Sequence, residues 1–213
     1  MVSHGTDCWR LAALSLCLLF VETLSAFQLQ DGDLLFVCPA HDNAITQVTT
    51  GVEGRPIDHV AIVRHVGGDG GPLFVVEAVK PAVRIVPIDT FLVDNAGADL
   101  LVGRVSVDMD VTRSLHGCLN MVGLPYDDLY LPGDSALYCS ELVQINYVTT
   151  AGTLIFEPIP MSFHDGSGRV TDYWQHFYST RGMTVPEAMP GSNPADLSRR
   201  PQLTILGQYP SRP

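Results

Sequence analysis

The sequence predicts an α+β fold in which an antiparallel sheet packs against a helix that begins at Cys139. Two β-branched runs, 58–64 and 73–79, flank the glycine-rich segment 67–71, an arrangement typical of a β-hairpin. After Cys139, apolar residues recur at helical spacing, so one face of that helix should be buried against the sheet. The hairpin and the helix together indicate a mixed, antiparallel architecture.

Strand runs, helix caps and breakers place the other elements in order. Residues 33–37, 83–86 and 100–105 are strand-like, and three further segments have helical patterns. The predicted helices, with the residues expected to begin or end them, are 42–50 (Asp42), 112–122 (Thr112 and Gly123) and 172–180 (Gly182). Prolines and glycines beyond residue 185 predict an extended C-terminal tail.

The hairpin brings a histidine and a glutamate together. If Gly68 is the tip of the turn, His59 and Glu77 are equally distant from it, directly opposed and on the same face, with Cβ atoms ~5 Å apart. A register slip of one residue would move Glu77 to the other face, whereas a slip of two would leave it diagonal to His59 and still usable. The pairing therefore depends on the parity of the register.

A cysteine at a helix N-terminus is a candidate nucleophile. A thiol attacks carbonyl groups as its thiolate, and the unpaired N–H groups and positive dipole end of a helix favour that form. With His59 as general base and Glu77 as the group that orients the imidazole, Cys139 completes a Cys-His-carboxylate triad. The alternative is that Cys139 fills a core and His59 is an ordinary strand histidine. Glu141 should face away and place a charge at the positive end of the helix.

Five motifs, in this order, resemble a known family. They are Gly32-Asp33-Leu34-Leu35-Phe36, Ile57-Asp58-His59-Val60-Ala61-Ile62-Val63, Val76-Glu77-Ala78, Leu124-Pro125-Tyr126-Asp127-Asp128 and Leu137-Tyr138-Cys139-Ser140-Glu141-Leu142-Val143. Across roughly residues 30–200 the chain resembles the YiiX-like permuted papain-like amidases, relatives of the NlpC-type cell-wall peptidases. In this circularly permuted branch, as in lecithin:retinol acyltransferase relatives, the histidine strand precedes the cysteine helix.

The resemblance implies a circularly permuted papain-like (NlpC-type) fold and a role for each site residue. It makes Cys139 the nucleophile, His59 the base and Glu77 the third polar residue. It also favours a substrate-binding role for Tyr126, in the loop 123–134 that should pass beside the active site. The alternative for Tyr126 is that its ring packs under the loop.

The N-terminus predicts export. The apolar run 11–21 is too short to span a bilayer comfortably and is followed by small residues, so residues 1–26 are expected to be a cleaved signal peptide. A lipid anchor on Cys17 is less consistent with the bulky Leu16 before it. Residues 27–213 then form a single domain with the extended tail, periplasmic or secreted, without a stable membrane span.

Charge and composition restrict the partners. The net charge of −11 would repel phosphate backbones, so no nucleic acid is expected as a partner. His41, Asp58 and His65 show no HExxH or CxxC spacing, and neither a metal site nor a cofactor is predicted. Cys38 and Cys118 form a disulfide or act as buried apolar fillers, and we favour fillers.

These observations predict an exported cysteine hydrolase that cleaves an amide bond through a Cys139 thioester. A cell-envelope peptide, an acylated amine or a lipid amide would each suit as substrate. Lipid acyl transfer or thioester hydrolysis by the same Cys-His-Glu site is the main alternative, because relatives of the permuted fold transfer acyl groups through such a cysteine. A non-catalytic binding module is a third interpretation, which the presence of all three triad residues disfavours.

Overall fold

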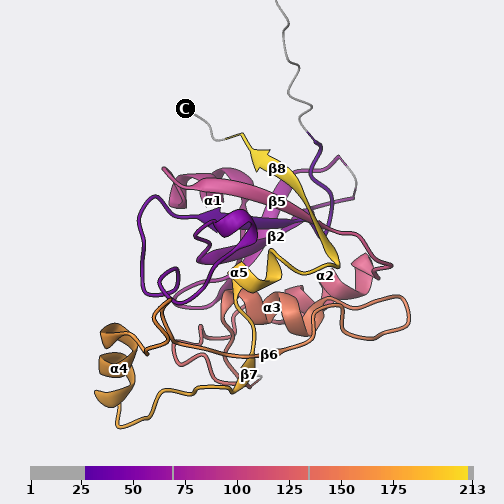
Figure 1. Cartoon of the computed structure of the whole chain (residues 1–213). Helices are drawn as coiled ribbons and strands as arrows, with labels where there is room; N and C mark the ends of the chain where they lie inside the picture. The colour runs from indigo at the N-terminus through magenta and orange to yellow at the C-terminus, as the bar shows by residue number, and fades with distance from the viewer. Residues whose placement is uncertain (1–26, 69, 134, 211–213) are drawn as a thin grey trace, which may run out of the picture.

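The chain folds around one six-stranded sheet (Figure 1). The structure is a computed structural model that describes residues 27–68, 70–133 and 135–210. Its elements are β1 (Leu34–Cys38), a short 3-10 helix (Val52–Gly54), β2 (His59–His65), β3 (Leu73–Ala78), β4 (Val83–Pro87), α1 (Ile88–Asp94), β5 (Asp99–Val105), α2 (Val111–Asn120), α3 (Cys139–Asn146), β6 (Ile159–Pro160), α4 (Asp172–Ser179), β7 (Pro190–Gly191), α5 (Pro194–Leu197) and β8 (Leu203–Tyr209). The predicted signal peptide, residues 1–26, lies outside the described residues.

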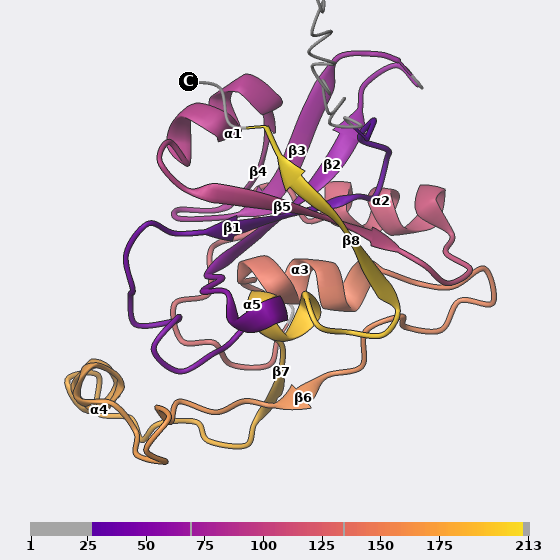
Figure 2. The same cartoon turned by 45° about the horizontal axis from the view of Figure 1, so that its top comes forward.

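The sheet is antiparallel throughout and has helices on both faces, as the α+β prediction requires. Its strand order is β4-β3-β2-β1-β5-β8. Phe91 of α1 packs in the apolar cluster on one face, and residues of α2, α3 and α5 pack in the larger cluster on the other. Figure 2 shows α1 and α3 on opposite sides of the strands. Both faces of the central strand β1 are therefore buried, which makes it a rigid base for its neighbour β2.

The hairpin has the predicted parity but not the predicted register. Ile62 pairs with Val76 and Val63 with Val75, a shift of two residues from the register centred on Gly68. The turn closes through a hydrogen bond from Val66 N to Pro72 O (2.9 Å), which moves its midpoint one residue along the chain. Glu77 is thus diagonal to the first residue of β2 rather than directly opposite it, on the same face.

Several local expectations were wrong. Residues 42–50 form turns rather than a helix, because the Asn43 side chain accepts the N–H groups of Ile45 and Thr46. The N-cap of α2 is Asp110, which accepts from Arg113 N, and not Thr112. The sequence analysis missed α1 altogether.

The C-terminal tail is more regular than its prolines suggest. It contains β7 and α5, and its last strand, β8, pairs with β5 at the edge of the main sheet. The tail therefore completes the fold instead of only wrapping around it. Cys38 and Cys118 are free and buried, as the apolar-filler interpretation requires.

A small aromatic cluster packs apart from the main sheet. Trp174 and Tyr178 of α4 pack with Phe163, and the indole Nε1 of Trp174 donates to Ala44 O (3.0 Å). Figure 2 shows α4 set apart from the main sheet and the helices that cover it, beyond β6 and β7. The cluster connects the turns at 42–50 to the C-terminal half of the chain. In the described residues, no helix has the length and apolar character needed to cross a membrane.

Glu141, predicted to place a charge at the positive end of the helix, is buried in the first turn of α3. It is 5% exposed, and its carboxylate accepts the backbone N–H groups of Tyr138 and Gly133. Burial and the negative charge of Asp127 raise the pKa of Glu141 to about 8, and Oε2 has no hydrogen-bond partner. The side chain therefore caps the helix and anchors the preceding loop while it favours its neutral form.

The raised pKa of Glu141 predicts a pH-dependent stability. Because the folded state favours the protonated acid, this contribution is fully present below the ordinary pKa of 4.5 and is lost as the pH rises through about 8. Glu141→Gln keeps an acceptor but cannot ionise, so its melting temperature relative to wild type should rise steadily across this range. Thermal unfolding with the exposed Glu157→Gln as control checks this. A constant difference at all pH values would contradict it.

Candidate active site

Cys139 is held rigidly at the first position of α3. The helix is buried against the sheet through Leu142 and Val143, and Cys139 itself is 4% exposed. The preceding Tyr138 is also buried, and its hydroxyl oxygen accepts from Ser192 N (3.1 Å). As the first helical residue, Cys139 has a backbone N–H without a partner inside the helix, so this group can receive negative charge.

His59 occupies the first position of β2 and bonds to Glu77. The distance from Nε2 of His59 to Oε2 of Glu77 is 2.6 Å, and the imidazole is 16% exposed. The ring also lies beside Phe91, with centroids 6.4 Å apart. Because Nε2 is taken by Glu77, Nδ1 is the ring nitrogen left to face Cys139, which hydrogen-bonds with His59 strongly enough to shift its pKa. The three predicted triad residues are therefore brought together with the imidazole in the middle.

The three residues meet at the end of a strand and not on one face of the sheet. Cys139 packs in the apolar cluster under α3, whereas Phe91, next to His59, packs in the cluster under α1. Glu77 shares the α1 face by the alternation of β3. His59 spans the two faces because it is the first residue of β2.

The electrostatics favour a charged imidazole at His59. Burial lowers the pKa of His59, but hydrogen bonds and negative charge from Cys139 and Glu77 outweigh burial and raise this pKa to about 10. Burial raises the pKa of Glu77, but His59 and Arg84 outweigh it and lower this pKa below its usual value. Glu77 is therefore ionised at neutral pH and stabilises a charged imidazole.

Arg84 is a partner of Glu77 that the sequence analysis missed. It lies directly opposite Glu77 on β4, and its Nε and Nη2 donate to Oε1 of Glu77 at 2.9 and 2.7 Å. Nη2 also donates to Oδ2 of Asp94, the last residue of α1, at 2.7 Å. An arginine on a strand is usually exposed to solvent, so Arg84 itself gave no signal in the sequence. The signal that could have found it is that a buried glutamate needs a cation as a partner.

Comparisons with known proteins identify the family of this chain. The family described as "Permuted papain-like amidase enzyme, YaeF/YiiX, C92 family" matches residues 28–207. The chain belongs to this family. It is also similar in fold to a solved structure from Escherichia coli O157:H7, with 21% identity, a TM-score of 0.70 and coverage of 86% of this chain and 100% of that one. No curated protein matches the chain.

The solved C92-family relative is described as "metalloprotein yiiX". In the present family member, no group of three or more His, Cys, Asp or Glu side chains is placed to hold a metal ion within 27–68, 70–133 and 135–210. The fold likeness confirms the permuted papain-like architecture predicted from the motifs.

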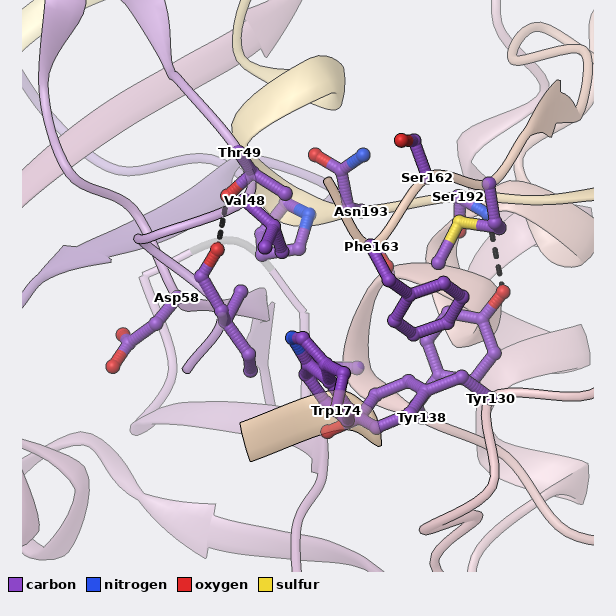
Figure 3. A pocket seen from close by; sticks show the side chains of 15 residues that line it. Val48, Thr49, Asp58, Tyr130, Tyr138, Ser162, Phe163, Trp174, Ser192 and Asn193 are labelled. Atoms are coloured by element: carbon purple, nitrogen blue, oxygen red, sulfur yellow. Dashed lines mark hydrogen bonds between the residues drawn. The ribbon is translucent and has the colours of Figure 1, made fainter. Parts of the chain in front are cut away.

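Two cavities meet at the Cys-His pair of this C92-family chain. The first borders Cys139 and is lined mainly by apolar side chains, among them Ile45, Val48, Met161, Phe163 and Trp174. Figure 3 shows the ring of Phe163 on one side of this cavity and Val48 on the other. The second borders His59 and includes Lys80, Asp128 and Tyr173. Tyr130 and Trp174 line both cavities and so form the wall between them.

Tyr126 borders the site. It lines the cavity at His59, and its hydroxyl lies 3.4 Å from that of Tyr130. Burial and the charge of Cys139 raise the pKa of Tyr126 far above its usual value, so the phenol remains a hydrogen-bond donor. A hydrogen-bond donor therefore borders the same cavity as His59.

Tyr130 is a second site residue without a sequence signal. Its backbone is left-handed, with φ of 52°, which is unfavourable for a residue with a side chain. The Asp127 carboxylate accepts from Leu129 N (2.7 Å) and Leu131 N (2.8 Å), and these bonds hold the chain on either side of Tyr130. The ring then packs against Tyr138, with centroids 5.3 Å apart. The loop is thus shaped to present Tyr130 beside Cys139.

Thiol reactivity should be concentrated at Cys139. Burial raises the pKa of the Cys118 thiol to about 12 and also raises the pKa of Cys38, whereas Cys139 borders a cavity and a protonated imidazole. In folded protein at about pH 6, iodoacetamide should label Cys139 first. Peptide mapping by mass spectrometry measures this. Faster labelling of Cys38 or Cys118 would remove the basis for treating Cys139 as the nucleophile.

Proposed function

We propose that this protein is an exported cysteine amidase that cleaves its substrate through an acyl thioester on Cys139. The observation that carries the proposal is the order Cys139, His59, Glu77 around one imidazole, in a chain that belongs to an amidase family. A cell-envelope peptide or an acylated amine is the proposed substrate class. The predicted signal peptide supports a substrate outside the cytoplasm.

The thiolate of Cys139 attacks the amide carbonyl carbon, and the carbonyl oxygen becomes an oxyanion beside the backbone N–H of Cys139. Protonated His59 then gives the proton on Nδ1 to the amide nitrogen, the carbon–nitrogen bond breaks, and the amine leaves. The acyl group remains as a thioester. Throughout, Glu77 holds the imidazole through Nε2 and stabilises its charged form.

Water completes the cycle. Neutral His59 accepts a proton from water at Nδ1, and the hydroxide formed attacks the thioester carbon. The carbon–sulfur bond breaks, the carboxylic acid leaves, and the thiolate of Cys139 and the imidazolium of His59 are restored. The phenol of Tyr126 is suited to hydrogen-bond the substrate near the reacting carbonyl group.

We infer that each half of the substrate occupies one of the two cavities. The acyl half stays on sulfur, so it occupies the apolar cavity at Cys139. The leaving amine takes its proton from His59, so it departs through the cavity that contains Lys80 and Asp128. This division suits an apolar acyl group joined to a polar amine.

The apolar lining also favours a second candidate, a lipid acyltransferase or thioesterase that uses the same three residues. In that reaction the thioester passes to an acceptor other than water, or the substrate itself is a thioester. Incubation of an acylated amine with and without an added amine acceptor separates amide hydrolysis from acyl transfer: hydrolysis releases the free acid and the original amine, whereas transfer yields an amide of the added acceptor.

The triad residues should have graded effects, because they form the bond, transfer the proton and orient the imidazole respectively. Cys139→Ala and His59→Ala should reduce turnover of an acylated amine to near background. Glu77→Gln keeps an acceptor and should lose roughly 10²- to 10⁴-fold in kcat. Steady-state kinetics measure the losses, and melting temperatures verify that each variant is folded. A folded Glu77→Ala variant with full activity would show that Glu77 does not orient His59.

A further inference from the structure

Glu77 is a nearly fully buried carboxylate with a different partner on each oxygen. It is 1% exposed; Oε2 contacts His59 and Oε1 accepts two bonds from Arg84. A carboxylate removed from water favours its neutral form unless cations compensate for the lost hydration. The groups that compensate here are His59 on β2 and Arg84 on β4.

Arg84 is fixed in a definite orientation. Its guanidinium group joins Glu77 to Asp94 of α1, with both Nη2 distances at 2.7 Å. The side chain is 38% exposed, so it reaches from solvent to a buried oxygen that faces away from the cavities. The two bonds to Oε1 restrict rotation of the carboxylate and leave Oε2 directed at the imidazole.

We propose that Arg84 is a positioning residue for the reaction: it keeps Glu77 ionised and oriented, and so sustains the imidazolium–thiolate pair of His59 and Cys139. The inference rests on the proposed function. Arg84 acts through Glu77 and His59. It lies at the outer end of this series of hydrogen-bonded side chains, where its Nη2 also donates to Asp94.

Loss of Arg84 should weaken the pair from a distance. With only His59 left to oppose burial, the pKa of Glu77 rises, and Oε1 loses the two bonds that orient the carboxylate. Glu77 then stabilises the imidazolium less, and a less stable imidazolium favours the neighbouring thiolate less. Alkylation of Cys139 would require higher pH as a result.

The chain offers a matched control in Arg104. It is 30% exposed and donates from Nε and Nη2 to Asp33, which is 1% exposed, at 2.7 Å each. Arg104→Met therefore removes a comparable half-buried ion pair between β5 and the residue that precedes β1. It should perturb stability in a similar way without contact with the site.

The test is the rate of Cys139 alkylation by iodoacetamide against pH, which needs no substrate. At about pH 6, Arg84→Met should react at least ~10-fold more slowly than wild type, and its rate profile should move to higher pH by about 1 unit. Arg104→Met should remain within about 3-fold of wild type. Arg84→Lys keeps the charge but not the fork, so it should fall between wild type and Arg84→Met.

Each outcome decides one claim. If wild-type Cys139 reacts no faster than Cys38 near pH 6, the proposed function fails whatever Arg84 does. If wild-type Cys139 is reactive and folded Arg84→Met has the profile of Arg104→Met, the positioning role is wrong while the proposed function stands. Should Arg84→Met not fold, Arg84→Lys decides, because a profile identical to that of wild type would overturn the inference.

Discussion

Burial of the Glu77 carboxylate between two cations is the constraint on which the rest of the site depends. Away from water, His59 and Arg84 together outweigh the effect of burial and keep the carboxylate ionised. One of them, Arg84, comes from the neighbouring strand, and the other is the imidazolium of His59. The buried charge thus connects the sheet directly to the protonation state of the Cys-His pair. Removal of either cation would leave the buried carboxylate with only one partner.

The location of this pair at a strand end explains how a buried network reaches a substrate. Glu77 and Arg84 lie on the α1 side of the sheet, and Cys139 begins α3 on the other. His59 is the first residue of β2, and from this strand end its imidazole contacts residues of both sides. The wall of Tyr130 and Trp174 then divides the open side into an apolar and a polar cavity. The same imidazole therefore faces two chemically different halves of a substrate.

The core of the site could be predicted from sequence because its geometry follows from periodicity. Alternation of apolar residues in the hairpin sets which face His59 and Glu77 share, and that parity survived a two-residue shift in register. The shift itself depends on how a glycine-rich turn closes, and glycines provide no side chains that specify it. The start of α3 at Cys139 was also predicted from a local pattern, the helical spacing of the apolar residues that follow it.

Features that depend on contacts distant in sequence could not be predicted. Arg84 looks like a solvated strand residue until the burial of Glu77 is known, and Glu141 looks like a helix-end charge until the loop before α3 covers it. The position of Tyr130 depends on two hydrogen bonds that the Asp127 carboxylate accepts from Leu129 N and Leu131 N. The strand β8 was not predicted, because the prolines that precede it indicate an extended tail. Its pairing with β5 nevertheless completes the sheet.

The most direct test of the central claim is the protonation state of His59 measured by nitrogen-15 NMR of the imidazole. At about pH 8, a free histidine is neutral, whereas the charges of Cys139 and Glu77 should keep both ring nitrogens of His59 protonated. In Cys139→Ala the same imidazole should lose a proton at lower pH, because the thiolate that stabilises it is gone. A neutral His59 in the wild-type protein at this pH would contradict the ion pair on which the account rests.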